Sequence, residues 1–285
     1  MSLTSRSMFA SLNISIWQAS VTDRAVAMRA EIEHDAENRT IKATKRLVPP
    51  QYLIPIKRIA QLGRDRHKQL TLPGLQEGMQ LLATKLFDDY AMIQSQIKDS
   101  FFEEVKRFED IYPSIIEKAP ARLGKTFRPE DFPAPEKIAS FFSYDVRFHR
   151  VPDSGNWLLD DVDMEDMDRL RNEVETENNN LYREASRELF DRGRKALENL
   201  FDQATNFKEG QSNGAILRDA TLNSVKEMAY LISAMNITGD PVLDVVSKEM
   251  QEKFIHLESK TLRNDAKERA SIADIAKQLL GKMDV

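Results

Sequence analysis

The sequence predicts a mainly α-helical protein with a small β element. Charged residues make up 31% of the 285 positions, whereas there are only 10 Gly and 11 Pro. Apolar side chains recur every three or four positions over long stretches, which is the spacing of one helical face. This balance favours an elongated bundle of long amphipathic helices over a turn-rich β architecture.

The β element is expected in three short stretches, near residues 11–18, 40–48 and 144–158. The first, LNISIWQA, partly alternates apolar and polar side chains, as a half-buried strand does. The second tolerates β structure and ends at Pro49 and Pro50. The third alternates loosely and contains a turn at residues 152–155, which predicts a second short strand around Trp157.

Two helices are expected in the first 75 residues. Thr22 or Asp23 is a suitable N-cap for a helix that runs to about Asn38. Pro55 is a good first-turn residue for the next helix. One face of that helix is apolar or small and comprises Ile56, Ile59, Ala60, Gly63 and His67. Basic residues follow its flank at Lys57, Arg64 and Lys68.

The strongest helical pattern spans residues 79–115. Its apolar residues follow one another in ten steps that average 3.6 residues: Met79, Leu82, Leu86, Tyr90, Ile93, Ile97, Phe101, Val105, Phe108, Tyr112 and Ile115. That period is typical of a nearly straight α-helix and differs from the 3.5 of a heptad coiled coil. Pro113 is expected to kink or end the helix, and residues 119–135 are predicted to form a loop. Pro135 then begins a short helix through about Phe142.

The second half of the chain predicts further helices. A long one begins at Asp163–Asp166 and runs to about Asn206, although residues 178–180 interrupt its apolar seam. After a break at residues 209–214, a helix from about Ile216 to Met235 leads into a tight connection. Gly239, Asp240 and Pro241 there supply a stop, a cap and a first-turn residue, so two antiparallel helices should follow one another. Ser271 is a candidate cap for the last helix. We therefore expect domains at residues 1–160 and 161–285, or one continuous domain.

The charge of the chain is unevenly distributed. The net charge is −5, yet residues 39–68 contain nine basic residues and one acidic residue. Residues 153–177 contain ten acidic residues and two basic ones. Such asymmetry is typical of an anionic partner, or of two parts of one protein that attract each other. The candidate contacts for an anionic partner are Lys45, Arg46, Lys57, Arg58, Arg64 and Lys68.

This basic segment has two interpretations. Its cations could contact phosphates, in which case nucleic-acid binding would weaken steeply with salt. Tyr52 is, however, the only aromatic residue in residues 39–68 that could stack on a base, and the whole chain is acidic. The alternative is that the segment docks on an acidic protein surface, for which the chain's own residues 160–177 are one candidate.

Several kinds of chemistry are absent from the sequence. There is no Cys, so thiolate catalysis and Cys-ligated metals are excluded. No two His lie within one helical turn, and no phosphate-binding or nucleophile-elbow motif occurs. The acidic run at residues 160–168 lacks the Gly and Glu of an EF-hand loop. We expect no enzymatic activity, no cofactor and no metal, and the absence of a long apolar segment predicts a cytoplasmic protein outside the membrane.

A set of short motifs resembles an uncharacterised domain family of tailed bacteriophages and prophages. The motifs are Arg64-x-x-His67-x-x-x-Thr71-x-Pro73, Leu123-Gly124, Asp131-Phe132-Pro133 and Val151-Pro152. They cover roughly residues 10–160. The genes of that family often neighbour a MoxR-type AAA+ ATPase and a protein with a von Willebrand A or CobT-like domain. The resemblance implies a partner in an ATP-driven assembly and assigns no catalytic residues.

Together these observations favour a non-enzymatic phage accessory protein that acts in the host cytoplasm through protein–protein contacts, with itself or with a AAA+ assembly. The competing hypothesis is a nucleic-acid-binding module that uses residues 39–68. An enzyme that relies on Asp and Glu pairs is a third interpretation.

Overall fold

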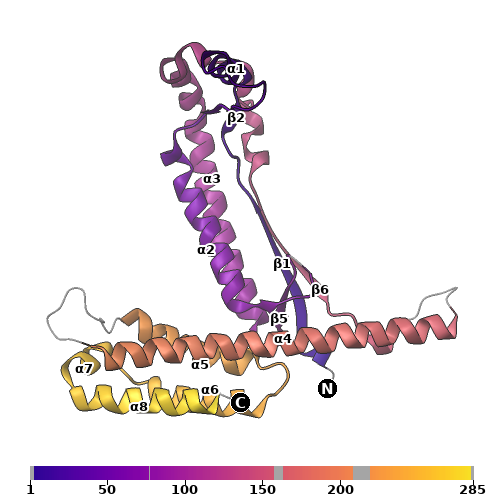
Figure 1. Cartoon of the computed structure of the whole chain (residues 1–285), viewed down its shortest axis with the longest axis vertical. Coiled ribbons are helices and arrows are strands. Elements are labelled where there is room, and N and C mark those ends of the chain that lie inside the picture. The colour runs from indigo at the N-terminus through magenta and orange to yellow at the C-terminus, as the bar shows by residue number, and fades with distance from the viewer. Residues whose placement is uncertain (1–2, 77, 157–162, 208–218, 284–285) are drawn as a thin grey trace. The chain divides into compact units, whose positions relative to one another are not determined.

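A computed structural model describes residues 3–76, 78–156, 163–207 and 219–283. The predicted mainly α architecture with a small antiparallel sheet is confirmed. The chain divides into two compact units, each assembled from separate stretches of sequence (Figure 1). Unit 1 comprises the described residues of Met1–Ser11, Lys68–Tyr90 and Arg147–Val285, and unit 2 comprises Leu12–His67 and Ala91–Val146. The division thus runs differently from the expected boundary at residue 160.

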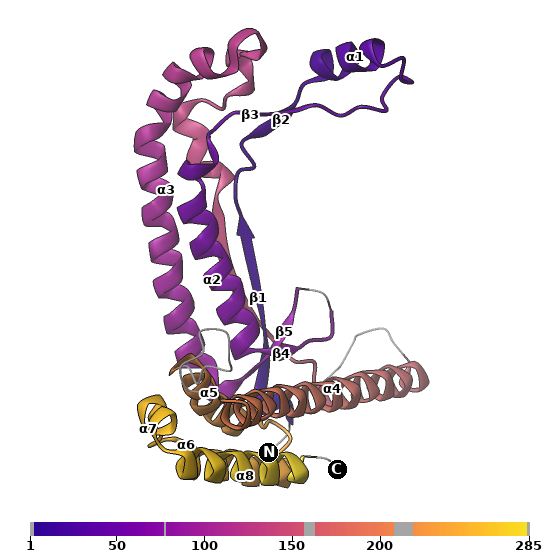
Figure 2. The same ribbon diagram turned by 60° about the vertical axis from the view of Figure 1, so that its left-hand side comes forward.

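Unit 2 is built around two long helices. These are α2 (Ile54–Leu70) and α3 (Phe87–Leu123), which lie side by side in both views (Figures 1 and 2). A short helix α1 (Arg24–Glu33) and a hairpin of β2 (Ser20–Thr22) and β3 (Thr44–Arg46) complete it. Apolar side chains from both long helices are buried in one core, which includes Ile56, Ala60, Phe101, Val105, Phe108 and Tyr112.

The face predicted for α2 is the face that is buried. Ile56, Ala60 and His67 are each at most 8% exposed, whereas Lys57 on the flank is exposed. Gly63 lies where a side chain would not fit, because an added Cβ would come within 2.3 Å of the hydroxyl of Tyr144. Burial of the small and apolar residues therefore fixes which side of α2 remains on the surface.

Unit 1 contains a helical group formed by the C-terminal part of the chain. Its helices are α4 (Met164–Thr205), α5 (Asp219–Met235), α6 (Pro241–Phe254), α7 (Ser259–Asn264) and α8 (Ala266–Lys282). Both α5 and α8 pack on α4, and α6 packs on α5. The predicted connection is confirmed: Gly239 has φ +71°, and the Asp240 side chain accepts hydrogen bonds from the N–H groups of Val242 and Leu243.

The sheet has the order β4-β5-β1-β6. Its strands are β4 (Leu72–Pro73), β5 (Gln80–Ala83), β1 (Ser7–Ser15) and β6 (Ser143–Arg150). β5 pairs antiparallel with the first residues of β1, from Ser7 to Ala10. Short 3₁₀ helices link other elements, at Leu3–Ser5, Pro50–Tyr52, Thr84–Leu86, Gly124–Thr126, Pro129–Asp131, Pro135–Phe141 and Ser154–Asn156.

The long seam predicted from residue 79 is only partly helical. Met79 and Leu82 lie outside α3, because Leu82 belongs to β5 and pairs with Met8 of β1. Pro113 does not end the helix, which continues to Leu123. The predicted loop therefore begins later than residue 119.

Other boundaries also moved. β1 begins at Ser7, before the predicted residue 11, and α1 ends at Glu33 rather than near Asn38. The last helix is capped by Asp265, and Ser271 lies inside it. The seam of α4 continues through Asn178, which is buried. The strand predicted around Trp157 and the break at residues 209–214 lie outside the described residues. None of the described helices is both long and apolar enough to cross a membrane.

Candidate functional site

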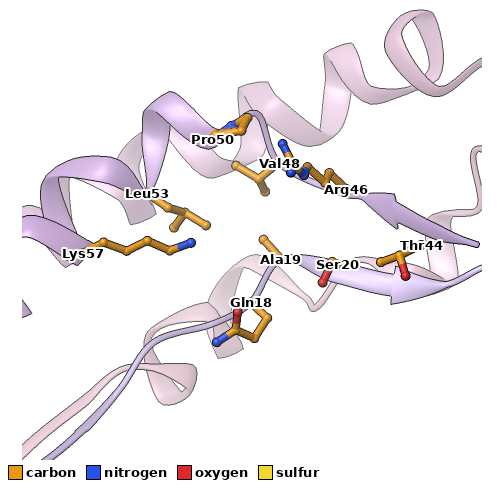
Figure 3. A pocket seen from close by; sticks show the side chains of 9 residues that line it. All are labelled: Gln18, Ala19, Ser20, Thr44, Arg46, Val48, Pro50, Leu53 and Lys57. Atoms are coloured by element: carbon orange, nitrogen blue, oxygen red, sulfur yellow. The ribbon is translucent and has the colours of Figure 1, made fainter.

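Two hollows in unit 2 share the lining residues Gln18 and Lys57, so we treat them as one groove. The first hollow, of about 450 Å³, lies beside the β2–β3 hairpin, and Figure 3 shows the amino end of Lys57 turned into it. The second, of about 550 Å³, lies between the end of β1 and α2. We call the set Gln18, Arg46, Lys57, Gln61 and Arg64 the basic groove.

Helix α2 supplies three of these side chains from one flank. Lys57, Gln61 and Arg64 follow one another in steps of four and three residues. The first and last are two helical turns apart, or about 10.5 Å along the axis. The guanidinium of Arg64 is held in place because its Nη2 donates a hydrogen bond of 3.1 Å to the carbonyl oxygen of Ile14. The groove therefore presents cations at a defined helical spacing.

The hairpin supplies Arg46, whose backbone is held from two directions. Arg46 is the register partner of Ser20, and the next residue, Leu47, donates its N–H to the carbonyl oxygen of Ala19 at 2.8 Å. The guanidinium of Arg122 donates to the carbonyl oxygens of both Arg46, at 2.9 Å, and Leu47. These bonds fix the backbone while leaving the Arg46 side chain exposed.

The groove has an unbalanced positive charge. Among the described residues that line either hollow there is no Asp or Glu. Within the described part of the chain, the side chains of Arg46 and Lys57 make neither an ion pair nor a hydrogen bond. The nearest carboxylate along α2 is that of Asp65, which accepts a 2.8 Å hydrogen bond from Gln61 Nε2. Three cations thus face an opening in which their charge is uncompensated.

Lys45 was predicted as a contact for an anionic partner, but the structure places it among acids of its own chain. Its side chain is only 9% exposed, and its Nζ lies 2.6 Å from Asp131 Oδ2 and 3.6 Å from Asp23 Oδ2. It also donates to the carbonyl oxygen of Thr126 at 2.6 Å. The backbone N–H of Val26, together with Lys45, lowers the pKa of Asp23 below its ordinary value. Lys45 is thus occupied within unit 2, and we leave it out of the basic groove.

The other predicted contacts lie outside the lining. Arg58 and Lys68 are exposed on α2, and Lys68 belongs to unit 1. Sequence reasoning missed Gln18 and Gln61. Gln61 was detectable, because it lies between Lys57 and Arg64 at helical spacing. Gln18 carried no such signal, since only folding brings it to the side of α2.

The groove is suited to binding an anion rather than to proton transfer. Its described lining offers guanidinium, ammonium and amide donors, but no carboxylate or imidazole that would act as a general base. Within the described residues, no cluster of three His, Asp or Glu side chains is arranged to hold a metal ion.

Comparison of the chain with protein-family models, with curated protein sequences and with solved structures found no match.

Proposed function

We propose that this chain is a non-enzymatic binding protein whose basic groove recognises an acidic segment of a protein partner. The observation that carries the proposal is the acid-free lining of the groove, in which Arg46 and Lys57 have no ion-pair partner among the described residues. A partner that brings carboxylates to this surface gains charge-assisted hydrogen bonds without competing against an internal acid.

An acidic protein segment fits the groove better than a nucleic acid does. The groove offers three cations, whereas nucleic-acid binding of useful strength commonly neutralises about 6 to 10 phosphates. No aromatic side chain lines either hollow, so the groove lacks a platform on which a base would stack. The net charge of −5 also opposes long-range attraction of a polyanion.

The resemblance to the tailed-phage family supplies the first partners to test. They are the MoxR-type AAA+ ATPase and the von Willebrand A or CobT-like protein encoded beside members of that family. In that setting the chain acts in the host cytoplasm as an accessory subunit of an ATP-driven assembly, and the groove is its docking surface.

The test is the binding of a fluorescent Glu-rich peptide, measured by anisotropy against a Gln-rich peptide of equal length. We expect selective binding of the Glu-rich peptide in about 0.1 M salt and loss of binding in about 1 M salt, because the Debye length falls from about 10 Å to about 3 Å. Lys57→Glu with Arg64→Glu should weaken binding by at least about tenfold, since two attractions become repulsions.

A matched control keeps the charge change and moves it off the groove. Arg58→Glu with Lys68→Glu alters the same helix by the same charge, but neither residue lines a hollow. It should retain most of the binding. Equal loss in both double variants would show that net charge, not the groove, controls binding. Single-stranded DNA of about 20 nucleotides serves as the competing ligand; tighter binding of the DNA through Lys57 and Arg64 would replace the proposal by the nucleic-acid alternative.

A further inference from the structure

The first third of α4 presents an exposed acidic surface. From the N-cap Asp163 to Glu177 the chain has seven acidic and two basic residues, a net charge of −5. The apolar side chains of Met167 and Val174 are 5% and 6% exposed, which fixes the side of the helix that is buried. The charged positions between them therefore point outward, and we call residues 163–177 the acidic helix segment.

Part of this charge is neutralised locally. Arg169 pairs with Asp166 at 2.8 Å, and Arg171 pairs with Asp168 at 3.4 Å, each three residues away on the same helix. The three remaining carboxylates in the helix, at Glu173, Glu175 and Glu177, are exposed and have no ion-pair partner in the described part of the chain. They form the uncompensated end of the segment.

The two surfaces are complementary in charge and in spacing. Lys57 and Arg64 are seven residues apart on α2, and Asp168 and Glu175 are seven residues apart on α4. Both intervals correspond to two helical turns, or about 10.5 Å. A helix laid along the groove would therefore bring carboxylates opposite both cations of α2 in one register, while Arg46 on the hairpin offers a third charge.

We propose that the basic groove of one copy of this chain binds the acidic helix segment of a second copy. This inference rests on the proposed function, because it names the partner of the same groove. The contact joins two different surfaces, so it is heterologous. It closes as a reciprocal pair or a ring, or it extends as an open chain of copies. Each copy then uses the excess charge of residues 163–177 to satisfy the unpaired cations of its neighbour.

Sedimentation velocity of the full chain over a range from low to high micromolar concentration tests this directly. We expect the average mass to rise with concentration in about 0.1 M salt and to return to the monomer value in about 1 M salt. Lys57→Glu with Arg64→Glu should abolish the rise, and so should Glu173→Lys with Glu175→Lys. Arg58→Glu with Lys68→Glu is again the control and should still associate.

Mixing the two defective variants gives the decisive result. The groove variant keeps an intact acidic helix segment, and the segment variant keeps an intact groove. We therefore expect the mixture to form a complex that contains one copy of each and grows no further. Circular dichroism and thermal unfolding of each variant confirm that loss of association is not loss of fold.

The failures of the two proposals are distinguishable. A chain that remains monomeric at every concentration, yet still binds the Glu-rich peptide through Lys57 and Arg64, would overturn the second-copy proposal and leave the proposed function intact. Association that persists in both double variants would also overturn it, since another surface would then join the copies. Loss of peptide binding and of association together would count against both.

Discussion

Two lysines of unit 2, Lys45 and Lys57, have opposite surroundings. Lys45 is 9% exposed and is held by two carboxylates and a carbonyl oxygen. Lys57 is exposed, and no acidic residue shares its part of the groove among the described residues. The same side chain therefore stabilises the fold at one position and is available for a partner at the other. What differs is whether the chain itself supplies the counter-charge.

The largest expected effect comes from removing Lys45. Lys45→Ala leaves Asp23 and Asp131 buried without their cation, and breaking a buried pair in this way typically costs about 3 to 5 kcal/mol of stability. Lys57→Ala should change stability by no more than about 0.5 kcal/mol, because the side chain is exposed and unpaired.

Urea unfolding followed by tryptophan fluorescence measures this difference. Trp17 packs against Phe108 and Tyr112 in unit 2, so in a Trp157→Phe background it reports on that unit. The ranking of the two lysines should reverse in the peptide-binding assay, where Lys57→Ala weakens binding. If both lysines had equal effects on unfolding, the division into a structural and an available cation would be incorrect.

An intermediate effect extends the comparison to the two sides of α2. Gly63→Ala places a methyl group 2.3 Å from the Tyr144 hydroxyl, and Tyr144 is only 1% exposed. The hydroxyl also donates to the side chain of Gln94, whose amide donates to the Gly63 carbonyl oxygen at 3.2 Å. We expect a loss of about 1 to 3 kcal/mol from overpacking, despite the better helix propensity of Ala.

The matched change on the groove side is Gln61→Ala, two residues away on the same helix and exposed. It should leave stability nearly unchanged in the same urea experiment. A stable Gly63→Ala variant would show that the Tyr144 ring can move aside, and that the buried side of α2 is less constrained than its packing indicates.

The smallest expected effect is a pH dependence of the buried cluster. The pKa of Asp23 lies below its ordinary value of 3.8, because the Val26 N–H and Lys45 favour the charged carboxylate. A lowered native pKa means that the stabilisation is present above about pH 4 and is lost as the pH falls through the native pKa. Acid titration removes only this carboxylate's share, so the effect is smaller than that of Lys45→Ala.

Unfolding measured between about pH 6 and about pH 2 checks the sign. Asp23→Asn should be less stable than the wild type at neutral pH and should show a shallower loss of stability on acidification. A variant with the same acid dependence as the wild type would mean that other carboxylates account for the loss.

Local patterns in the sequence determined much of the helical structure. Apolar spacing identified the buried face of α2 and most of α3, and Asp163 and Asp240 cap helices where capping chemistry predicted them. Basic residues on the flank of α2 also identified Lys57 and Arg64. Each of these features depends on residues within a few turns of one another, so one stretch of sequence contains the information.

The tertiary structure decided what depends on distant partners. Leu82 fits a helical period, but pairing with Met8, 74 residues away, places it in a strand. Lys45 and Lys57 look alike in the sequence, yet only folding brings Asp131 to Lys45 and Gln18 to Lys57. Burial and charge pairing depend on which segments meet in space, and the local pattern around each lysine does not specify that meeting.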